Sequence, residues 1–200
     1  MTNPTESEKL PKLSAEGLAK SAKAATEKGP PPVHLWNPPF CGDLDIRIAR
    51  NGAWYYLGSP IGRKELVKLF SSILRKEGAD YYLVTPVEKV GITVDDAPFV
   101  AVDFDVEGIG PNQQLRFYTQ VEEEVVASED FPIRVEVDPD GGEPSPYILV
   151  RANLEALIDR KSFYRLVEMG EHRVVDGVRW FGVQSSGTFF PIIHSDELVD

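Results

Sequence analysis

The segment WNPPFCGDLD, residues 36–45, carries side chains whose types and spacing could support catalysis. Its Cys41 is the single cysteine of the chain, His34 lies seven residues before it, and Asp43 and Asp45 follow within four residues. A cysteine becomes an effective nucleophile when a histidine comes within hydrogen-bond distance of its thiol. A lone cysteine more commonly packs in the hydrophobic core as a small apolar side chain, and we favour that interpretation of Cys41.

A second group of acidic side chains could bind a divalent cation. Asp103, Asp105 and Glu107 alternate with apolar residues in FVAVDFDVEG, residues 99–108, so all three leave the same face of a predicted strand. Carboxylate oxygens are the ligands that Mg²⁺ and Ca²⁺ prefer, but carboxylates on an exposed strand face usually contact only water. The three histidines of the chain have no zinc-ligand spacing. We therefore predict no metal site, no cofactor and no catalytic residue.

The elements that position these residues begin with a hairpin. DIRIARNGAWYYLG, residues 45–58, has apolar runs on both sides of an Asn-Gly pair, which favours the positive φ angles of a tight β turn. Residues 61–77 then place their apolar side chains on one half of a predicted helix, with Gly78 at the position of a left-handed C-cap. A further strand follows, so the predicted local order is strand, strand, helix, strand.

The start of this helix recurs later in the chain. IGRKELVKLF at residues 61–70 and IDRKSFYRLV at residues 158–167 share Ile, Arg, Lys and Leu at the same four positions, so Arg63 corresponds to Arg160. The second copy has Asp159 as a good N-cap, and in both copies a glycine and an aromatic strand follow the helix. We interpret the two stretches as a degenerate internal repeat with an offset of 97 residues.

Between the two helices the pattern is mainly that of β-strands. The alternating residues 99–108 lead into the turn GIGPNQ, and a returning strand follows it. Residues 131–152 hold two more strands around a connection rich in Gly and Pro. Because these connections are short, we predict an α+β protein in which antiparallel pairing prevails.

Residues 1–32 form a region of different composition. Residues 13–32, LSAEGLAKSAKAATEKGPPP, are rich in Ala, Lys and Ser and end in three prolines. We predict a flexible arm here, with a short helix capped by Ser14 as the alternative. The rest of the chain divides into an N-terminal α+β unit at residues 33–92 and a C-terminal β-rich unit at residues 93–200.

The net charge of −11 is concentrated in one segment. Residues 95–143 contain fourteen Asp and Glu and two Arg, a balance of −12, so the rest of the chain carries +1. Such a surface disfavours nucleic acid and anionic membranes as partners. We interpret it as a solvated polar face, with a site for a cation or a basic partner as the alternative.

The sequence also predicts a cytoplasmic location. No apolar run reaches the ~20 residues needed to span a bilayer. The N-terminal residues contain no apolar stretch that could act as the core of a signal peptide, and one cysteine cannot form an intrachain disulfide.

Three runs carry a resemblance to a known family. They are WNPPFCGDLDIRI at residues 36–48, GSPIGRKELVKLFSSILRKE at residues 58–77 and YYLVTPVEKVGITVDDAPF at residues 81–99. They resemble the bacterial family DUF1285, a domain of unknown function. The resemblance implies two small α+β units with antiparallel β-roll-like sheets, each with one principal helix, related by duplication, and a homodimer. A role in signal transduction has been proposed for the family, which offers no catalytic residues to transfer.

We predict a non-enzymatic binding or regulatory module of the signal-transduction type, because no acid, base and nucleophile converge in the sequence. Its partner would be an unidentified protein or small molecule, or a second copy of the chain, and neither nucleic acid nor a membrane. Five residues are our ligand-binding candidates: Trp36, Asp43, Asp45, Arg63 and Arg160.

Two alternatives remain open. One is a small hydrolase or transferase that uses carboxylates gathered by the fold, namely Asp43, Asp45, Asp95 and Asp96. It predicts a pocket in which these side chains converge. The other is a purely structural homodimer, which predicts a large exposed apolar patch and no pocket.

Overall fold

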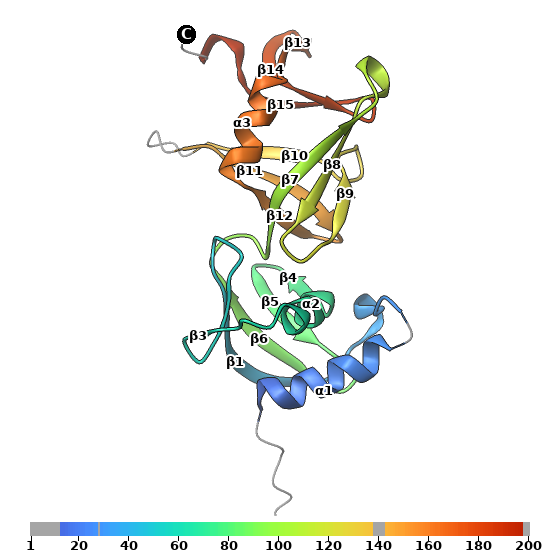
Figure 1. The fold of residues 1–200 in the computed structure, drawn as a ribbon, viewed down its shortest axis with the longest axis vertical. Helices are drawn as coiled ribbons and strands as arrows, with labels where there is room; N and C mark the ends of the chain where they lie inside the picture. The colour runs from blue at the N-terminus through green and yellow to red at the C-terminus, as the bar shows by residue number, and fades with distance from the viewer. Residues whose placement is uncertain (1–12, 28, 138–142, 198–200) are drawn as a thin grey trace, which may run out of the picture. The chain divides into compact units, whose positions relative to one another are not determined.

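The β-rich pattern of the sequence gives three sheets, which are distributed over two units of the chain. A computed structural model of the chain describes residues 13–27, 29–137 and 143–197. The first unit comprises Met1–Ile46 and Tyr56–Thr93, and the second comprises Arg47–Tyr55 and Val94–Asp200 (Figure 1). Within the described residues, no helix is both long and apolar enough to cross a bilayer.

The first unit is built around a six-stranded sheet. Its elements are α1 (Ala15–Thr26), a 3₁₀ turn η1 (Val33–Leu35), β1 (Phe40–Ile48), β2 (Trp54–Tyr56), β3 (Ser59–Pro60), α2 (Lys64–Ser72), β4 (Leu74–Glu77), β5 (Asp80–Val84) and β6 (Lys89–Val94). Residues 47–55, which include the end of β1 and most of β2, belong to the second unit. The strands lie in the order β3-β2-β1-β6-β5-β4, and β4, β5 and β6 form an antiparallel meander. Phe70 of α2 is fully buried, as are Leu83 and Val90 of this meander.

The second unit contains two sheets and one helix. Its elements are β7 (Phe99–Glu107), η2 (Gly110–Asn112), β8 (Gln114–Thr119), β9 (Glu124–Val126), β10 (Ile133–Glu136), β11 (Ser145–Arg151), β12 (Leu154–Ile158), α3 (Arg160–Glu168), β13 (Glu171–Val175), β14 (Val178–Ser185), β15 (Thr188–His194) and η3 (Ser195–Glu197). One sheet has the order β10-β11-β12-β7-β8-β9, and the other has the order β13-β14-β15. The predicted two-unit α+β architecture is confirmed.

The internal repeat extends well beyond the two helices. The series β1-β2-β3-α2-β4-β5-β6 is matched by β10-β11-β12-α3-β13-β14-β15, since each has three strands, a helix and a three-stranded antiparallel meander. In the first copy β1 lies beside β6, and in the second copy β10 and β15 are again in contact. The second unit adds the meander β7-β8-β9 to the edge of β12.

At least one strand pair departs from the antiparallel pattern that we predicted. β12 and β7 pair in parallel, with Ala156, Leu157 and Ile158 beside Phe99, Val100 and Ala101. The prediction considered only strands joined by short connections. β7 and β12 are separated by four intervening strands, so no hairpin determines their relative direction.

Residues 15–26, which the prediction placed in a flexible arm, form the helix α1. The Ser14 hydroxyl accepts a hydrogen bond from the Gly17 N–H at 3.1 Å, as the alternative interpretation predicted. The helix buries Ala15, Leu18 and Ala22 and contacts α2. Its small alanine side chains permit the helix to pack closely, so few large apolar groups are needed to hold it in place. The earlier part of the predicted arm, residues 1–12, lies outside the described residues.

The helix predicted over residues 61–77 is shorter in the structure. α2 ends at Ser72, residues 74–77 form β4, and Gly78, with φ +61°, lies in the turn between β4 and β5. The Ser71 and Ser72 hydroxyls donate hydrogen bonds to the carbonyl oxygens of Lys68 and Leu69, respectively. Such side-chain bonds compete with the backbone hydrogen bonds that would extend the helix. Leu74 is buried in β4. An apolar residue at this position is therefore compatible with the helical pattern that we predicted and with the strand that forms.

Candidate functional site

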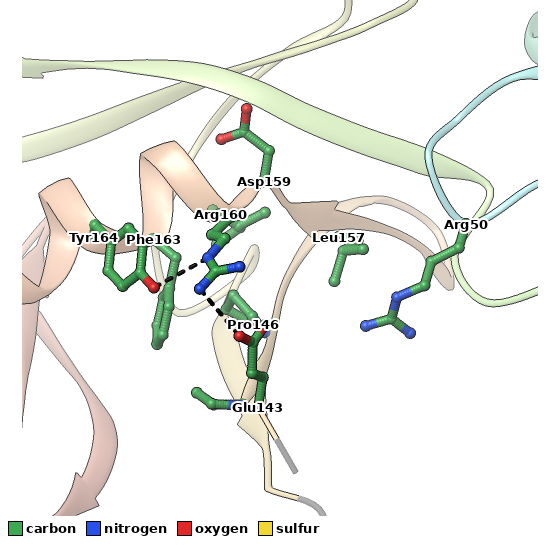
Figure 2. Close-up of a pocket in the computed structure, with 10 residues that line it drawn as sticks. Arg50, Glu143, Pro146, Leu157, Asp159, Arg160, Phe163 and Tyr164 are labelled. Atoms are coloured by element: carbon green, nitrogen blue, oxygen red, sulfur yellow. Dashed lines mark hydrogen bonds and ion pairs between the residues drawn. The ribbon is translucent and has the colours of Figure 1, made fainter.

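A small cavity lies beside the start of α3 in the second unit (Figure 2). Its volume is about 240 Å³. It combines two arginines with an apolar lining and is formed by Arg50, Glu143, Pro144, Pro146, Leu157, Ile158, Asp159, Arg160, Phe163 and Tyr164. We call this cavity the α3 cleft.

Helix capping positions the first of the two arginines. The chain leaves β12 at Ile158, and the Asp159 carboxylate accepts a hydrogen bond from the Ser162 N–H at 2.8 Å. This contact starts the helix at Arg160 and places Tyr164 one turn further along the same face. Arg160 Nε donates to the Tyr164 hydroxyl at 3.0 Å, and Arg160 Nη2 pairs with a Glu143 carboxylate oxygen at 3.1 Å (Figure 2).

The second arginine comes from the hairpin tip between β1 and β2. Arg50 Nη1 pairs with the Asp96 carboxylate, and Arg50 Nη2 donates to the Ser145 hydroxyl at 2.8 Å. Tyr147 donates to the other Asp96 oxygen at 2.8 Å, and burial together with this carboxylate raises the pKa of the Tyr147 phenol. In Figure 2 Arg50 and Arg160 lie on opposite sides of Leu157.

The cations of the α3 cleft are accessible to solvent while their surroundings are largely apolar. The side chains of Arg160 and Glu143 are 68% and 75% exposed, so their ion pair is open to exchange with an anion from solution. Arg50 is 57% exposed. Among the ten described lining residues there is no cysteine, serine or histidine, and the Asp159 carboxylate is engaged by the helix cap. The arrangement is suited to binding an anion that carries a small apolar group.

The five predicted ligand-binding residues do not share this cleft. Arg160 lines it, whereas Arg63 lines a different cavity, in the first unit. Trp36 is half-buried, and its carbonyl accepts a hydrogen bond from Arg75 at 2.7 Å. Asp43 and Asp45 lie on the exposed face of β1, and Asp43 lies over Gly91, where a Cβ would meet its carboxylate.

Cys41 is not packed in the core as we predicted. It is exposed near the start of β1, and its thiol donates to the Pro39 carbonyl at 3.5 Å. The regular alternation of buried residues in β1 begins at Leu44, so core packing starts three residues after the cysteine. His34 lies in η1 and forms no hydrogen bond with Cys41 among the described residues. The structure therefore shows no Cys–His nucleophile in this segment.

The carboxylates of the acidic segment are largely paired with arginines of the same unit. Asp95 binds Arg47, Asp103 binds Arg165, Glu107 binds Arg116, Glu123 binds Arg151, and Glu136 binds Arg134. A hydrogen bond from Arg47 lowers the pKa of Asp95, and one from Arg116 lowers that of Glu107. For Asp103 the backbone N–H of Phe104 is the main cause of the lowered pKa, with Arg165 contributing. In the described residues, much of the negative charge of this segment is therefore paired with arginines, while the paired carboxylates of Asp103, Glu107 and Glu136 remain exposed to solvent.

Of the four aspartates of the hydrolase alternative, Asp43 and Asp45 belong to the first unit and Asp95 and Asp96 to the second. Asp95 and Asp96 each pair with an arginine, while Asp43 and Asp45 lie on the exposed face of β1. None of them lines the α3 cleft. Over residues 13–27, 29–137 and 143–197, no three His, Cys, Asp or Glu side chains come close enough together to hold a metal ion.

Apart from Arg160, none of the residues that line the α3 cleft was among the ligand-binding candidates predicted from the sequence. Tyr164 stands four positions after Arg160, a spacing that places two side chains on the same helix face and could have indicated their contact. No local signal points to Arg50, because it reaches Asp96 and Ser145 from remote parts of the chain.

Comparison with known proteins gives matches along most of the chain. The model of the N-terminal domain of DUF1285, a domain of unknown function, matches residues 31–97, and the model of its C-terminal domain, described as a protein of unknown function, matches residues 98–192. The crystal structure of a DUF1285 family protein from Silicibacter pomeroyi DSS-3 is similar, with 61% identity, coverage of 92% of this chain and 98% of that chain, and a TM-score of 0.82.

A second solved structure, a DUF1285 family protein from Shewanella baltica OS155, is 30% identical. The match covers 62% of this chain and 91% of that chain, with a TM-score of 0.49. No curated protein matches the chain.

Proposed function

The chain belongs to the DUF1285 family of proteins of unknown function, and from this premise we propose that it is a non-enzymatic binding module whose second unit binds a small anion in the α3 cleft. The observation that carries the proposal is the placement of Arg50 and Arg160 around one cavity that also contains Leu157 and Phe163. The binding would serve regulation of the signal-transduction type.

The size and chemistry of the α3 cleft support a particular class of ligand. A volume of about 240 Å³ is below the ~300–1,000 Å³ of cavities that hold drug-sized molecules, so the ligand is small. Guanidinium groups recognise carboxylates and phosphates through paired hydrogen bonds. The ring of Phe163 and the side chains of Pro146 and Leu157 provide an apolar contact for the body of the ligand. We therefore expect an aryl or short alkyl carboxylate or phosphate.

A cytoplasmic location is part of this proposal. Cys41 is exposed and forms no disulfide. Such a thiol persists in the reducing environment of the cytoplasm.

Titration of the full chain with phenyl phosphate and benzoate, followed by amide NMR, tests the proposal. Both compounds are expected to bind and to shift resonances of α3, whereas the uncharged benzyl alcohol is expected to bind at least tenfold more weakly. Arg160→Gln and Arg50→Gln should each weaken binding about tenfold, equivalent to the loss of one charged contact.

Arg179→Gln is the matched control, since Arg179 is an exposed arginine of β14 that does not line the cleft. It removes the same charge and should leave the affinity unchanged. The proposal fails if neither anion shifts the α3 resonances at millimolar concentration. It also fails if Arg179→Gln weakens binding as much as Arg160→Gln does.

A further inference from the structure

A groove in the first unit is lined by more basic than acidic side chains, in contrast to the acidic segment at residues 95–143. It lies between α1 and α2 and has a volume of about 650 Å³. Its lining residues are Ala19, Lys20, Lys23, Arg63, Glu65, Leu66 and Leu69. We call it the α1–α2 groove.

The floor of the α1–α2 groove is apolar and incompletely covered. Leu18 and Ala22 of α1 are buried, and α1 contacts α2. Leu66 and Leu69, on the apolar stripe of α2, remain only half-buried. α1 therefore covers part of this stripe and leaves the rest open beside Ala19.

Three cations line the rim of the groove without partners. Lys20, Lys23 and Arg63 are exposed, and none of the three forms an ion pair or a side-chain hydrogen bond with another described residue. In the same unit, Arg75 and Lys89 are both paired with Glu77. The single acid of the groove, Glu65, lies in the first turn of α2, where a helix dipole favours a negative charge.

We propose that the α1–α2 groove docks an acidic amphipathic segment of a partner protein. Carboxylates of the segment would pair with Lys20, Lys23 and Arg63, and its leucine-type side chains would cover Ala19, Leu66 and Leu69. Charge complementarity selects this occupant, because three unpaired cations over an apolar floor match a helix that carries both acidic and apolar side chains. The site is in the first unit and is independent of the anion site proposed for the α3 cleft.

The test measures binding of a fluorescein-labelled designed helix to the full chain by anisotropy. The probe peptide carries leucines at helical spacing with glutamates beside them. One control peptide replaces every glutamate by glutamine, and a second replaces every leucine by serine. The probe should bind with a micromolar Kd and each control peptide at least tenfold more weakly. Equal binding of the probe and the glutamine peptide overturns the proposal.

Arg63→Asp separates loss of binding from loss of folding. Arg63 is the N-cap of α2, has extended φ and ψ, and makes no side-chain capping bond, so aspartate adds a favourable cap there. The variant should bind the probe at least tenfold more weakly with an unchanged or raised Tm. Lys64→Glu, at the adjacent exposed position outside the groove lining, makes the same change in net charge and should alter the Kd less than twofold.

Two further outcomes would also overturn the proposal. The first is binding of phosphatidylserine vesicles, lost in Arg63→Asp, with no binding of the probe, since the occupant would then be a membrane surface. The second is an equal loss of probe binding in Arg63→Asp and Lys64→Glu, because the groove would then have no specific role.

Discussion

At the scale of single residues, Glu143 is the acidic lining residue of the α3 cleft that pairs with Arg160. Its carboxylate pairs with Arg160 at 3.1 Å, so a carboxylate of the chain itself already occupies part of the position that a ligand anion would take. Both partners are mostly exposed, and such pairs contribute little to stability. If the α3 cleft binds an anion as we propose, Glu143 would act as a weak internal competitor for it.

Glu143→Gln should strengthen binding of phenyl phosphate by about two- to fivefold, the range expected for removal of one exposed ion pair. Isothermal titration calorimetry of the full chain measures this change. Glu136→Gln is the control, since Glu136 also pairs with an arginine but does not line the cleft. Unchanged or weaker binding by the Glu143 variant would contradict the role of Glu143 as a competitor.

At the scale of elements, α1 depends on its cap and on one narrow buried stripe. The Ser14 hydroxyl accepts from the Gly17 N–H, and the Leu18 N–H donates to the Ser14 carbonyl at 3.0 Å. Ser14→Ala removes the first contact and should destabilise α1 by about 1 kcal/mol. Amide hydrogen exchange should then be about fivefold faster at Gly17 and Leu18, by the same free energy.

Ser21→Ala is the control for this prediction. Ser21 lies in the same helix away from its cap, and alanine has the higher helix propensity, so the variant should not accelerate exchange at Gly17. Equal exchange rates in Ser14→Ala and in the unmodified chain would show that the cap does not hold the start of α1.

Local sequence patterns predicted which helices and strands form better than they predicted where these elements end. They predicted the residues of the α3 cleft least well. The Asn-Gly turn, the Asp159 cap and the repeat of α2 and α3 were readable because each depends on residues close together in the chain. The end of α2 could not be predicted in this way, because residues 74–77 leave the helical pattern to pair with β5. The residues of the α3 cleft were also only partly predictable from local patterns. Arg160 was identified through the repeat, whereas Arg50 contacts residues more than forty positions away in the chain.

At the scale of the whole molecule, charge is divided unequally between the two parts of the chain. Residues 95–143 carry a balance of −12, but most of their described carboxylates pair with arginines, including those of Asp96, Glu124 and Glu143. In the first unit, Lys20, Lys23 and Arg63 of the α1–α2 groove form no ion pair with another described residue. Local pairing, rather than the net charge of a segment, therefore determines which surface is available to a charged partner.

This pairing gives the stability of the chain a predictable dependence on pH. Asp95, Asp103, Glu107 and Glu77 all have lowered pKa values in the folded state, and for Asp95 the chief cause is its hydrogen bond with Arg47. The unfolded chain therefore binds protons first as the pH falls through the ordinary values of 3.8 for Asp and 4.5 for Glu. The stabilisation is fully present above about pH 4.5 and is lost progressively below it.

Arg47→Gln tests this dependence at one ion pair. The variant should have a lower Tm than the unmodified chain at pH 7 in low salt. The difference should shrink towards pH 3, because Asp95 is then increasingly protonated in the unfolded chain and the folded ion pair must compete with this protonation. Added salt of about 0.5 M should reduce the difference at pH 7, since the pair is partly exposed. Arg179→Gln should show neither effect. A Tm difference for Arg47→Gln that stays constant between pH 7 and pH 3 would mean that Arg47 stabilises the fold through packing on Tyr55, whose ring lies 5.8 Å from its guanidinium, rather than through Asp95.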